Sequence, residues 1–361
     1  MVESRSVERV RSDIVKLSQA GLDSLSFRRE AMRRLRTVVP VDSFWFATAD
    51  PETLLFTGSL VEDIPECATP LFVANELLQD DVNKWVHLAA KQPGVDSLVA
   101  ATKGRLETSP RYRDILAPLC FGDELRAALG DGHATWGFMC LHREHGGSHF
   151  SADEALFLTS IAPHLAQALR GAVLRERAGT ADEDGPGLLL LANDFSLIAA
   201  TPAGQKWLAE IADIGLHDGL PQVIYAVAAR LLSEDRPAAL PKLPRARVQT
   251  HSGHWLIVHA SQLNGGDGTG QIAVILEPAR PAELAPLLLG AYGLTARESD
   301  IARLVLRGIA TAGIALELSI SELTVQQHLK SIFNKTGVGS RRELVAHIFA
   351  RHYKPSRRNV R

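Results

Sequence analysis

The sequence predicts a multidomain fold in which two α+β domains are followed by an all-α domain of four helices. The chain has 361 residues, a length that suits two or three domains. Up to about residue 278, short strand-like runs alternate with helical patterns, whereas residues 294–349 carry helical patterns only. We predict domains at residues 1–174, 187–278 and 290–353. Linkers are expected at 175–187, which is charged and rich in small residues, and at 278–286.

The first domain is expected to open with helical structure over residues 1–39, where Leu25, Met32 and Leu35 give one helix an apolar side. Strands are expected at 44–47 and 53–57, then a helical stretch at about 69–90. A hairpin follows from 123–129 and 134–142 around a glycine-rich turn. Ser151 with Glu154 three residues later predicts the start of a long helix that runs through residue 170.

The second domain is expected to begin with two strands around the turn Asn193-Asp194. Helices are expected at 202–211 and 221–232, and strands at 246–250, 255–261 and 271–277. In its order of elements, this part resembles a PAS domain. The first domain, through Phe150-Ser151-Ala152-Asp153-Glu154 and Ala162-Pro163-His164-Leu165, is similar to a GAF sensor domain.

The two resemblances imply sensor domains that bind a small molecule, although the sequence identifies no ligand and no cofactor. Aromatic side chains would line such pockets, and core packing is the simpler interpretation of each one. The candidates are Trp45, Phe46 and Trp136 in the first domain and Trp207 and Trp255 in the second.

The helical unit at residues 294–349 shows capping signals at its helix starts. Thr295 with Glu298 forms a capping box for the first helix, and Ser340 with Glu343 forms one for the last. A short second helix is expected at 312–318, capped by Thr311, and a third helix is expected to be capped by Ser321. The order of the second and third helices, joined by a tight turn, predicts a helix-turn-helix.

On the third helix, Val325, Leu329 and Ile332 recur at helical spacing and are expected to face inward. The opposite side is then free to contact a duplex, with long polar groups for base edges and a short hydroxyl for phosphate. The candidate DNA contacts are Thr324, Gln326, Gln327 and Lys330 on this helix and Arg341 and Arg342 at the start of the last helix. The alternative is that these side chains are only the solvated side of an amphipathic helix.

The same stretch resembles the LuxR-type DNA-binding domain, on residues that occur in the family's order. They are Leu294-Thr295-Ala296-Arg297-Glu298, Ile314-Ala315, Leu318, Ile320-Ser321, Thr324-Val325, His328, Lys335, Gly337-Val338 and the run from Ser340 to Leu344. The resemblance implies binding of double-stranded DNA and a homodimer formed through the last helix, with Leu344, Val345 and Ile348 as the dimerisation residues. Two positions depart from the family pattern: Ala312-Gly313 replaces Lys-Glu, and Gln326 replaces a basic residue.

Charge is distributed unevenly along the chain. Twelve Lys and Arg against five Asp and Glu lie from Ala291 onward, a balance of +7, so the preceding residues carry the remaining 27 basic and 36 acidic groups, a balance of −9. This places the basic charge where the helix-turn-helix is expected. Three scattered cysteines, no signal-peptide pattern and no apolar run of 18 residues favour a cytoplasmic protein without a membrane segment.

No catalytic pattern stands out, so we expect a transcriptional regulator and not an enzyme. His142, His145 and His149 lie close together, but their spacing fits no zinc pattern, and surface histidines are the favoured interpretation. Two alternatives remain for the two predicted α+β domains, residues 1–174 and 187–278, which we call the front domains. They bind a protein partner in place of a small molecule, or they form an enzyme with a regulatory tail.

Overall fold

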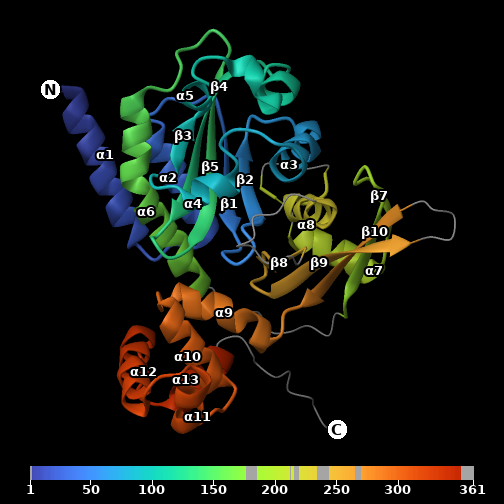
Figure 1. The fold of residues 1–361 in the computed structure, drawn as a ribbon. Helices are drawn as coiled ribbons and strands as arrows, with labels where there is room; N and C mark the ends of the chain where they lie inside the picture. Colours follow the sequence, from blue (N-terminus) through green and yellow to red (C-terminus); the bar gives the residue numbers. More distant parts are fainter. Residues whose placement is uncertain are drawn as a thin grey trace.

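The structure of the protein, a computed structural model, describes residues 2–175, 185–211, 213–214, 219–233, 244–264 and 270–350 (Figure 1). The expected linker at 175–187 lies mostly outside the described residues. The described part holds two five-stranded antiparallel sheets with helices, followed by an all-helical C-terminal region. This confirms the predicted fold class.

The first sheet has the strand order β2-β1-β5-β4-β3. Along β1, Phe44 and Phe46 lie in the core on one face, whereas Ala47 and Ala49 lie in the core on the other, because successive side chains of a strand alternate. Helices α2 and α6 pack on the first face, α1 packs against these two helices, and α4 and α5 contact the sheet through β4. The bounds are α1 Val2–Ser18, α2 Ser24–Leu35, β1 Ser43–Ala49, β2 Phe56–Glu62, α3 Thr69–Leu78, α4 Trp85–Ala90, β3 Val95–Ser97, α5 Leu98–Ala101, β4 Phe121–Gly130, β5 Thr135–Glu144 and α6 Ala152–Arg175.

Several details of the first sheet region differ from the predictions. The predicted strand at 53–57 starts only at Phe56, since Leu54 adopts φ 56° in the preceding turn. The predicted helix at 69–90 breaks into α3 and α4, where Glu76 Oε1 accepts a hydrogen bond from Trp85 N at 2.7 Å and holds the break. Strand β3, helix α5, the short 3-10 turn Leu106–Thr108 and the π-helical turn Tyr112–Leu116 were not predicted.

The second sheet has the order β7-β6-β10-β9-β8, and its elements match the predicted order. The bounds are β6 Gly187–Leu191, β7 Leu197–Ala200, α7 Pro202–Glu210, α8 Gln222–Leu232, β8 Arg245–Gln249, β9 Trp255–Asn264 and β10 Gly270–Pro278. Helix α8 contacts its own sheet and also α3 and β2 of the first part (Figure 1).

Buried polar contacts join the two parts across this interface. Arg247 Nη2 lies 2.5 Å from Asp50 Oδ1, with both side chains buried. Asp213 Oδ1 accepts a hydrogen bond from Ser59 N at 2.7 Å. One hydrophobic core includes residues of both sheets. A shift of side chains in one part can therefore displace side chains of the other part directly, because the two parts share buried contacts.

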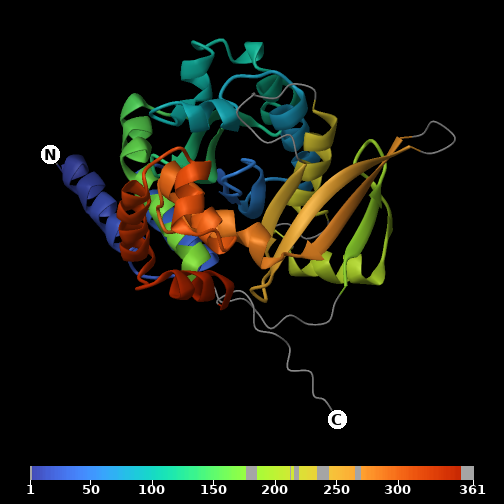
Figure 2. The same cartoon turned by 60° about the horizontal axis from the view of Figure 1, so that its bottom comes forward.

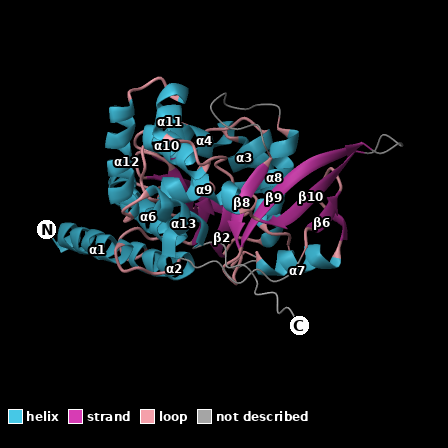
Figure 3. Cartoon of the chain, turned by 90° about the horizontal axis from the view of Figure 1, so that it is seen from below, coloured by secondary structure: helices cyan, strands magenta, loops and turns pink. Residues whose placement is uncertain are grey.

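The prediction of a linker at 278–286 is wrong, because helix α9, Pro281–Ala291, occupies most of it. A proline at the first position of a helix loses no hydrogen bond, so Pro281 is compatible with a helix start. Helix α9 is apolar on more than one side: Leu287 and Ala291 lie in the core of the first part, and Leu284 and Leu288 lie in that of the helical region. In the view from below, α9 lies between the helical region and the second sheet (Figure 3).

The helical region contains α10 Ala296–Leu306, α11 Thr311–Glu317, α12 Glu322–Thr336 and α13 Arg341–Ala350. It packs at the end of the molecule where α6 finishes, with α9 between it and the sheets (Figure 2). Among the described helices, none combines the length and the hydropathy that a bilayer crossing requires.

Candidate functional site

Helices α11 and α12 form the predicted helix-turn-helix. Ser319 takes a left-handed φ of 52° in the turn, and Arg297 Nη2 donates to Leu318 O at 2.7 Å, which fixes the turn to α10. Ser321 caps α12 as predicted, since its Oγ accepts from Thr324 N at 3.0 Å. The relative positions of the two helices are thus set by local hydrogen bonds as well as by apolar packing.

Helix α12 has a buried back and an exposed front. Val325, Leu329 and Ile332 are all at most 2% exposed, as predicted. The candidate contacts Gln326, Gln327 and Lys330 are exposed, as are Leu323 and Asn334 on the same side of the helix, whereas Thr324 and His328 are half-buried. This front offers an exposed, mostly polar helix surface to a flat or grooved partner.

Glu298 holds α12 against α10. Its carboxylate accepts hydrogen bonds from Thr295 N (2.7 Å), Ser331 Oγ (2.6 Å) and Lys335 Nζ (2.7 Å). Burial opposes ionisation, but the hydrogen bonds from Lys335, Ser331 and Thr295 outweigh it and lower the pKa of Glu298 to about 2. Thr295 Oγ1 accepts in return from Glu298 N, so the predicted capping box is present.

Arg341 and Arg342, both predicted as DNA contacts, lie in different surroundings. Arg341 donates to Ile309 O at 3.0 Å and to Thr311 Oγ1 at 2.9 Å, so its guanidinium holds the start of α11. Arg342 is exposed. Thr311 was predicted to cap α11, but Ala310 occupies that position, and Thr311 Oγ1 instead receives Arg341.

The two departures from the family pattern have local explanations. A Cβ at Gly313 would lie only 2.9 Å from Ile309 Cγ2, so glycine lets α11 approach the preceding loop. Gln326 lies on the exposed side of α12, and its Nε2 is 3.4 Å from Thr311 Oγ1. The glutamine therefore spans the gap between the two helices of the motif.

The predicted dimerisation residues are used within the chain. Leu344 is 0% and Ile348 is 2% exposed, and both belong to the core of the helical region, against which Val345 also packs. Tyr292 Oη and His347 Nε2, 2.5 Å apart, further tie α13 to the end of α9. A dimer through Leu344 and Ile348 would require α13 to leave this core.

A second candidate site is a cavity of about 50 Å³ between the first sheet, α3 and α8. A buried water needs only about 10–15 Å³ of such space, so the cavity has room for more than one water. Its wall is aromatic on several sides, with Trp45 stacked on Trp85 at a centroid distance of 5.7 Å. The lining residues are Trp45, Phe56, Val61, Ile64, Thr69, Phe72, Val73, Glu76, Trp85, Arg126, Cys140, His142 and Gln222.

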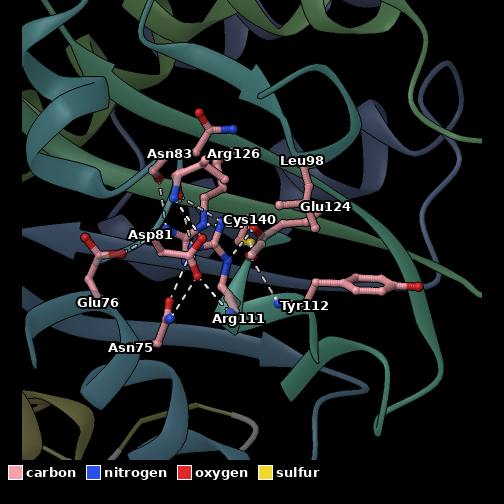
Figure 4. A network of polar contacts seen from close by, with 12 residues as sticks. Asn75, Glu76, Asp81, Asn83, Leu98, Arg111, Tyr112, Glu124, Arg126 and Cys140 are labelled. Carbon is pink, nitrogen blue, oxygen red and sulfur yellow. Dashed lines mark hydrogen bonds and ion pairs between the residues drawn. The ribbon is translucent and has the colours of Figure 1, made fainter. Parts of the chain in front are cut away.

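A buried ion network reaches this cavity through Glu76 and Arg126, which line it (Figure 4 shows the network). Glu124 Oε2 lies 2.8 Å from Arg111 Nε and 3.2 Å from Arg126 Nε, and Arg126 Nη1 is 2.8 Å from Glu76 Oε2. Asp81 Oδ2 accepts from Arg111 N at 2.7 Å. Burial opposes ionisation of Glu124, but Arg111 and Arg126 hold its pKa well below the usual range.

This network was not among the predicted sites. Residues 123–129 were predicted as a strand, yet β4 is buried almost throughout while carrying Asp123, Glu124 and Arg126. Charged residues inside a strand that is covered on both faces indicate buried ion pairs or a site, and that signal was available.

His142 corrects the prediction of three surface histidines. It is 1% exposed in β5, with Nδ1 3.1 Å from Ser43 Oγ, whereas His145 and His149 are exposed as expected. Within the described residues, Glu124, Cys140 and His142 form a possible metal-ligand group. Glu124 is already paired with two guanidinium groups, and burial together with Glu124 raises the pKa of the Cys140 thiol well above its usual value, so the cluster disfavours a cation.

Two sequence comparisons concern the C-terminal part. Residues 293–348 match the family model described as bacterial regulatory proteins, luxR family. A transcriptional regulator of the HTH type from the exeN 3′ region of Aeromonas salmonicida is 40% identical over 70 residues, which cover 19% of this chain. The chain spans about a third (35%) of that relative. The prediction of a LuxR-type helix-turn-helix domain is therefore confirmed for residues 293–348.

Solved structures resemble the chain only weakly. Escherichia coli SdiA aligns over 95% of this chain and 98% of its own, at 12% identity and a TM-score of 0.31. The Vibrio cholerae VqmA dimer aligns over 47% and 84%, at 19% identity and a TM-score of 0.20. The DhaR(N)–DhaL complex from E. coli aligns over 77% and 90%, at 12% identity and a TM-score of 0.22. These likenesses are too weak to support conclusions about ligand or assembly.

Proposed function

We propose that this protein is a sequence-specific transcriptional regulator that binds double-stranded DNA through α12. The observation that carries the proposal is the exposed polar front of α12, fixed on a buried apolar back within a LuxR-type domain. We therefore expect the protein in the cytoplasm, where bacterial DNA lies.

The side chains of α12 fit the chemistry of a DNA major groove. Gln326 and Gln327 present amide groups that match adenine N6 and N7, and Lys330 carries a positive charge for phosphate or guanine. Thr324 lies in the first turn of α12, where the helix N-terminus favours a phosphate. Arg342 is placed for a phosphate contact, while the proposed contact by Arg341 would require its guanidinium to leave Ile309 and Thr311.

We also propose that the protein binds its operator as a homodimer, because one helix-turn-helix contacts only a few base pairs. The proposed contact uses Leu344, Val345 and Ile348 of α13, and because Leu344 and Ile348 are buried in the helical core, it requires α13 to leave that core.

The front domains are proposed to be GAF-like and PAS-like sensors whose state controls the C-terminal domain. The aromatic cavity of the first domain supports a small-molecule ligand, and Gln222 of the second domain lies in its wall. Helix α9 provides the physical route, since its apolar residues pack in both the first core and the helical core. A ligand shifts the population of DNA-binding molecules only if it binds one arrangement of these cores better than another.

Fluorescence anisotropy with labelled duplexes tests the DNA-binding surface. Lys330→Ala is expected to weaken binding to every sequence and to reduce the slope of log Kd against log salt by about one. Gln326→Ala is expected to relax preference at one base pair, at a cost of about 1–3 kcal/mol. Lys16→Ala, an exposed lysine on α1, serves as the matched control. If Lys330→Ala and Gln326→Ala both behave like Lys16→Ala, the assignment of this front is wrong.

A second candidate role for the front domains is binding of a protein partner, and the edge of the second sheet favours it. Strand β7 forms that edge, and Leu188, Leu197 and Ile198 are 42–50% exposed there. Exposed apolar side chains beside an unpaired strand are suited to a protein contact. Replacing Ile198 with Lys would abolish such a contact without affecting the cavity of the first domain.

A further inference from the structure

The aromatic cavity contains polar groups whose hydrogen-bonding capacity is only partly used. Arg126 is 3% exposed, and its Nη1 donates to Glu76 Oε2 and to Asn83 O. Its Nε is fully buried 3.2 Å from Glu124 Oε2, so the donor left for a ligand is Nη2, which has no acceptor within the part of the chain that the structure describes. A buried guanidinium with unused donors is costly unless another acceptor reaches it.

Gln222 provides a second donor, and it comes from the other domain. Its Oε1 accepts from Trp45 Nε1 at 2.7 Å and from Ser59 Oγ at 2.9 Å. The amide oxygen is thereby occupied and the side chain oriented, which leaves Nε2 with no acceptor among the residues that the structure describes. Since both Gln222 and Arg126 line the cavity, two domains contribute polar side chains to one space.

The aromatic residues of the cavity wall favour ligands of a particular shape. Trp85 stacks on Phe138 at 4.8 Å and lies beneath the Arg126 guanidinium, whose Cζ is 4.2 Å from the ring. Flat aromatic walls favour a flat apolar body. At about 50 Å³ the space is roughly a third of the ~150 Å³ that accommodates benzene, so a six-membered ring enters only if part of the wall moves, and the half-buried side chains of Ile64 and Phe72 are the least confined part of it.

The buried charges beside the cavity favour a neutral ligand over an anionic one. The network beside the cavity brings together three carboxyl groups, on Glu76, Asp81 and Glu124, and two guanidinium groups, on Arg111 and Arg126, with the imidazole of His142 3.5 Å from Glu124 Oε1. A carboxylate ligand would add a further acidic group to this buried cluster, and burying an excess charge is strongly unfavourable. A neutral acceptor makes the same hydrogen bonds without that penalty.

We propose that this cavity binds a small, flat, uncharged molecule that bears a hydrogen-bond acceptor such as an amide carbonyl, received by Arg126 and by Gln222 of the second domain. The inference rests on the proposed sensor function and specifies its ligand class. It also makes Gln222 the residue through which α8 and the second domain detect an occupied first domain.

Titration of the full chain labelled with 5-fluorotryptophan tests the proposal, with benzamide as the neutral probe and benzoate as its anion of the same shape. Fluorine NMR is expected to show benzamide shifting the signals of Trp45 and Trp85, with a Kd about tenfold or more below that of benzoate. Gln222→Leu is expected to weaken benzamide binding about tenfold, the effect of one lost hydrogen bond, and Gln205→Leu, an exposed glutamine of α7, is expected to leave it unchanged.

Three results would overturn the proposal: benzoate binding as tightly as benzamide, neither probe shifting Trp45 and Trp85, or equal benzamide affinities for Gln222→Leu and Gln205→Leu. We also measure DNA binding by the same samples, because it distinguishes a wrong ligand class from a wrong assignment as a regulator. A chain that binds DNA normally but shows any of these results has a different ligand class, whereas a chain that binds no DNA contradicts the regulator assignment.

Discussion

Removing the charge of Glu298 should loosen α12 without touching its exposed front. Glu298→Gln keeps the shape of the side chain but weakens the contacts to Lys335 and Ser331. The difference between the ordinary pKa of 4.5 and the folded value of about 2 corresponds to roughly 3 kcal/mol. Lys335 is 35% exposed, so solvent screening reduces this figure, and we expect a loss of about 1–2 kcal/mol at pH 7.

Hydrogen exchange of the α12 amides in the full chain measures this loss as local opening. Protection of Leu329 and Ile332 is expected to fall about 5–30-fold in Glu298→Gln, and Glu317→Gln, whose ion pair with Arg307 is exposed, is expected to change it less than about twofold.

The pH dependence gives an independent check on Glu298. Because folding lowers the pKa of this carboxyl, its contribution is complete above about 4.5 and disappears as pH falls toward about 2. The variant and the parent should therefore converge in acid. Equal protection at pH 7, or a difference that persists at pH 2, would refute the role given to Glu298.

Other contacts give further predictions. Ser321→Ala removes the cap of α12 and should destabilise the helix-turn-helix by about 1 kcal/mol, measured by the same exchange experiment; an unchanged α12 would mean that the cap is not needed. Arg247→Met leaves Asp50 buried without its partner and should lower stability by about 3–5 kcal/mol in calorimetry, with loss of the contact between the two sheets. Arg245→Met, which removes a partly exposed pair, should cost about 1 kcal/mol or less, and equal effects of the two changes would contradict the interface described above.

The sequence predicted elements best where local signals and tertiary packing agree. Capping residues and periodic apolar positions located α10 and α12 and the buried side of α12, because each signal acts within one or two turns. The strands of the second sheet were found because apolar runs there are separated by clear turns.

Features that depend on contacts between distant residues escaped prediction. Helix α9 was mistaken for a linker because its two prolines resemble loop signals, while its stability comes from burial of Leu284 and Leu287 in two separate cores. The hydrogen bond between Gln222 and Trp45 cannot be predicted from local sequence patterns, because the two residues are 177 positions apart. The homodimer through Leu344, Val345 and Ile348 was inferred from the family resemblance and stays a prediction, while Leu344 is buried within its own chain.

Selection of bound sites from random duplexes by the full chain tests the central claim most directly. We expect an enriched motif with two symmetric half-sites, and we expect the Gln326→Ala protein to lose preference at one position in each half. Bound pools without any enriched sequence, or an unchanged motif for Gln326→Ala, would contradict base recognition by the front of α12.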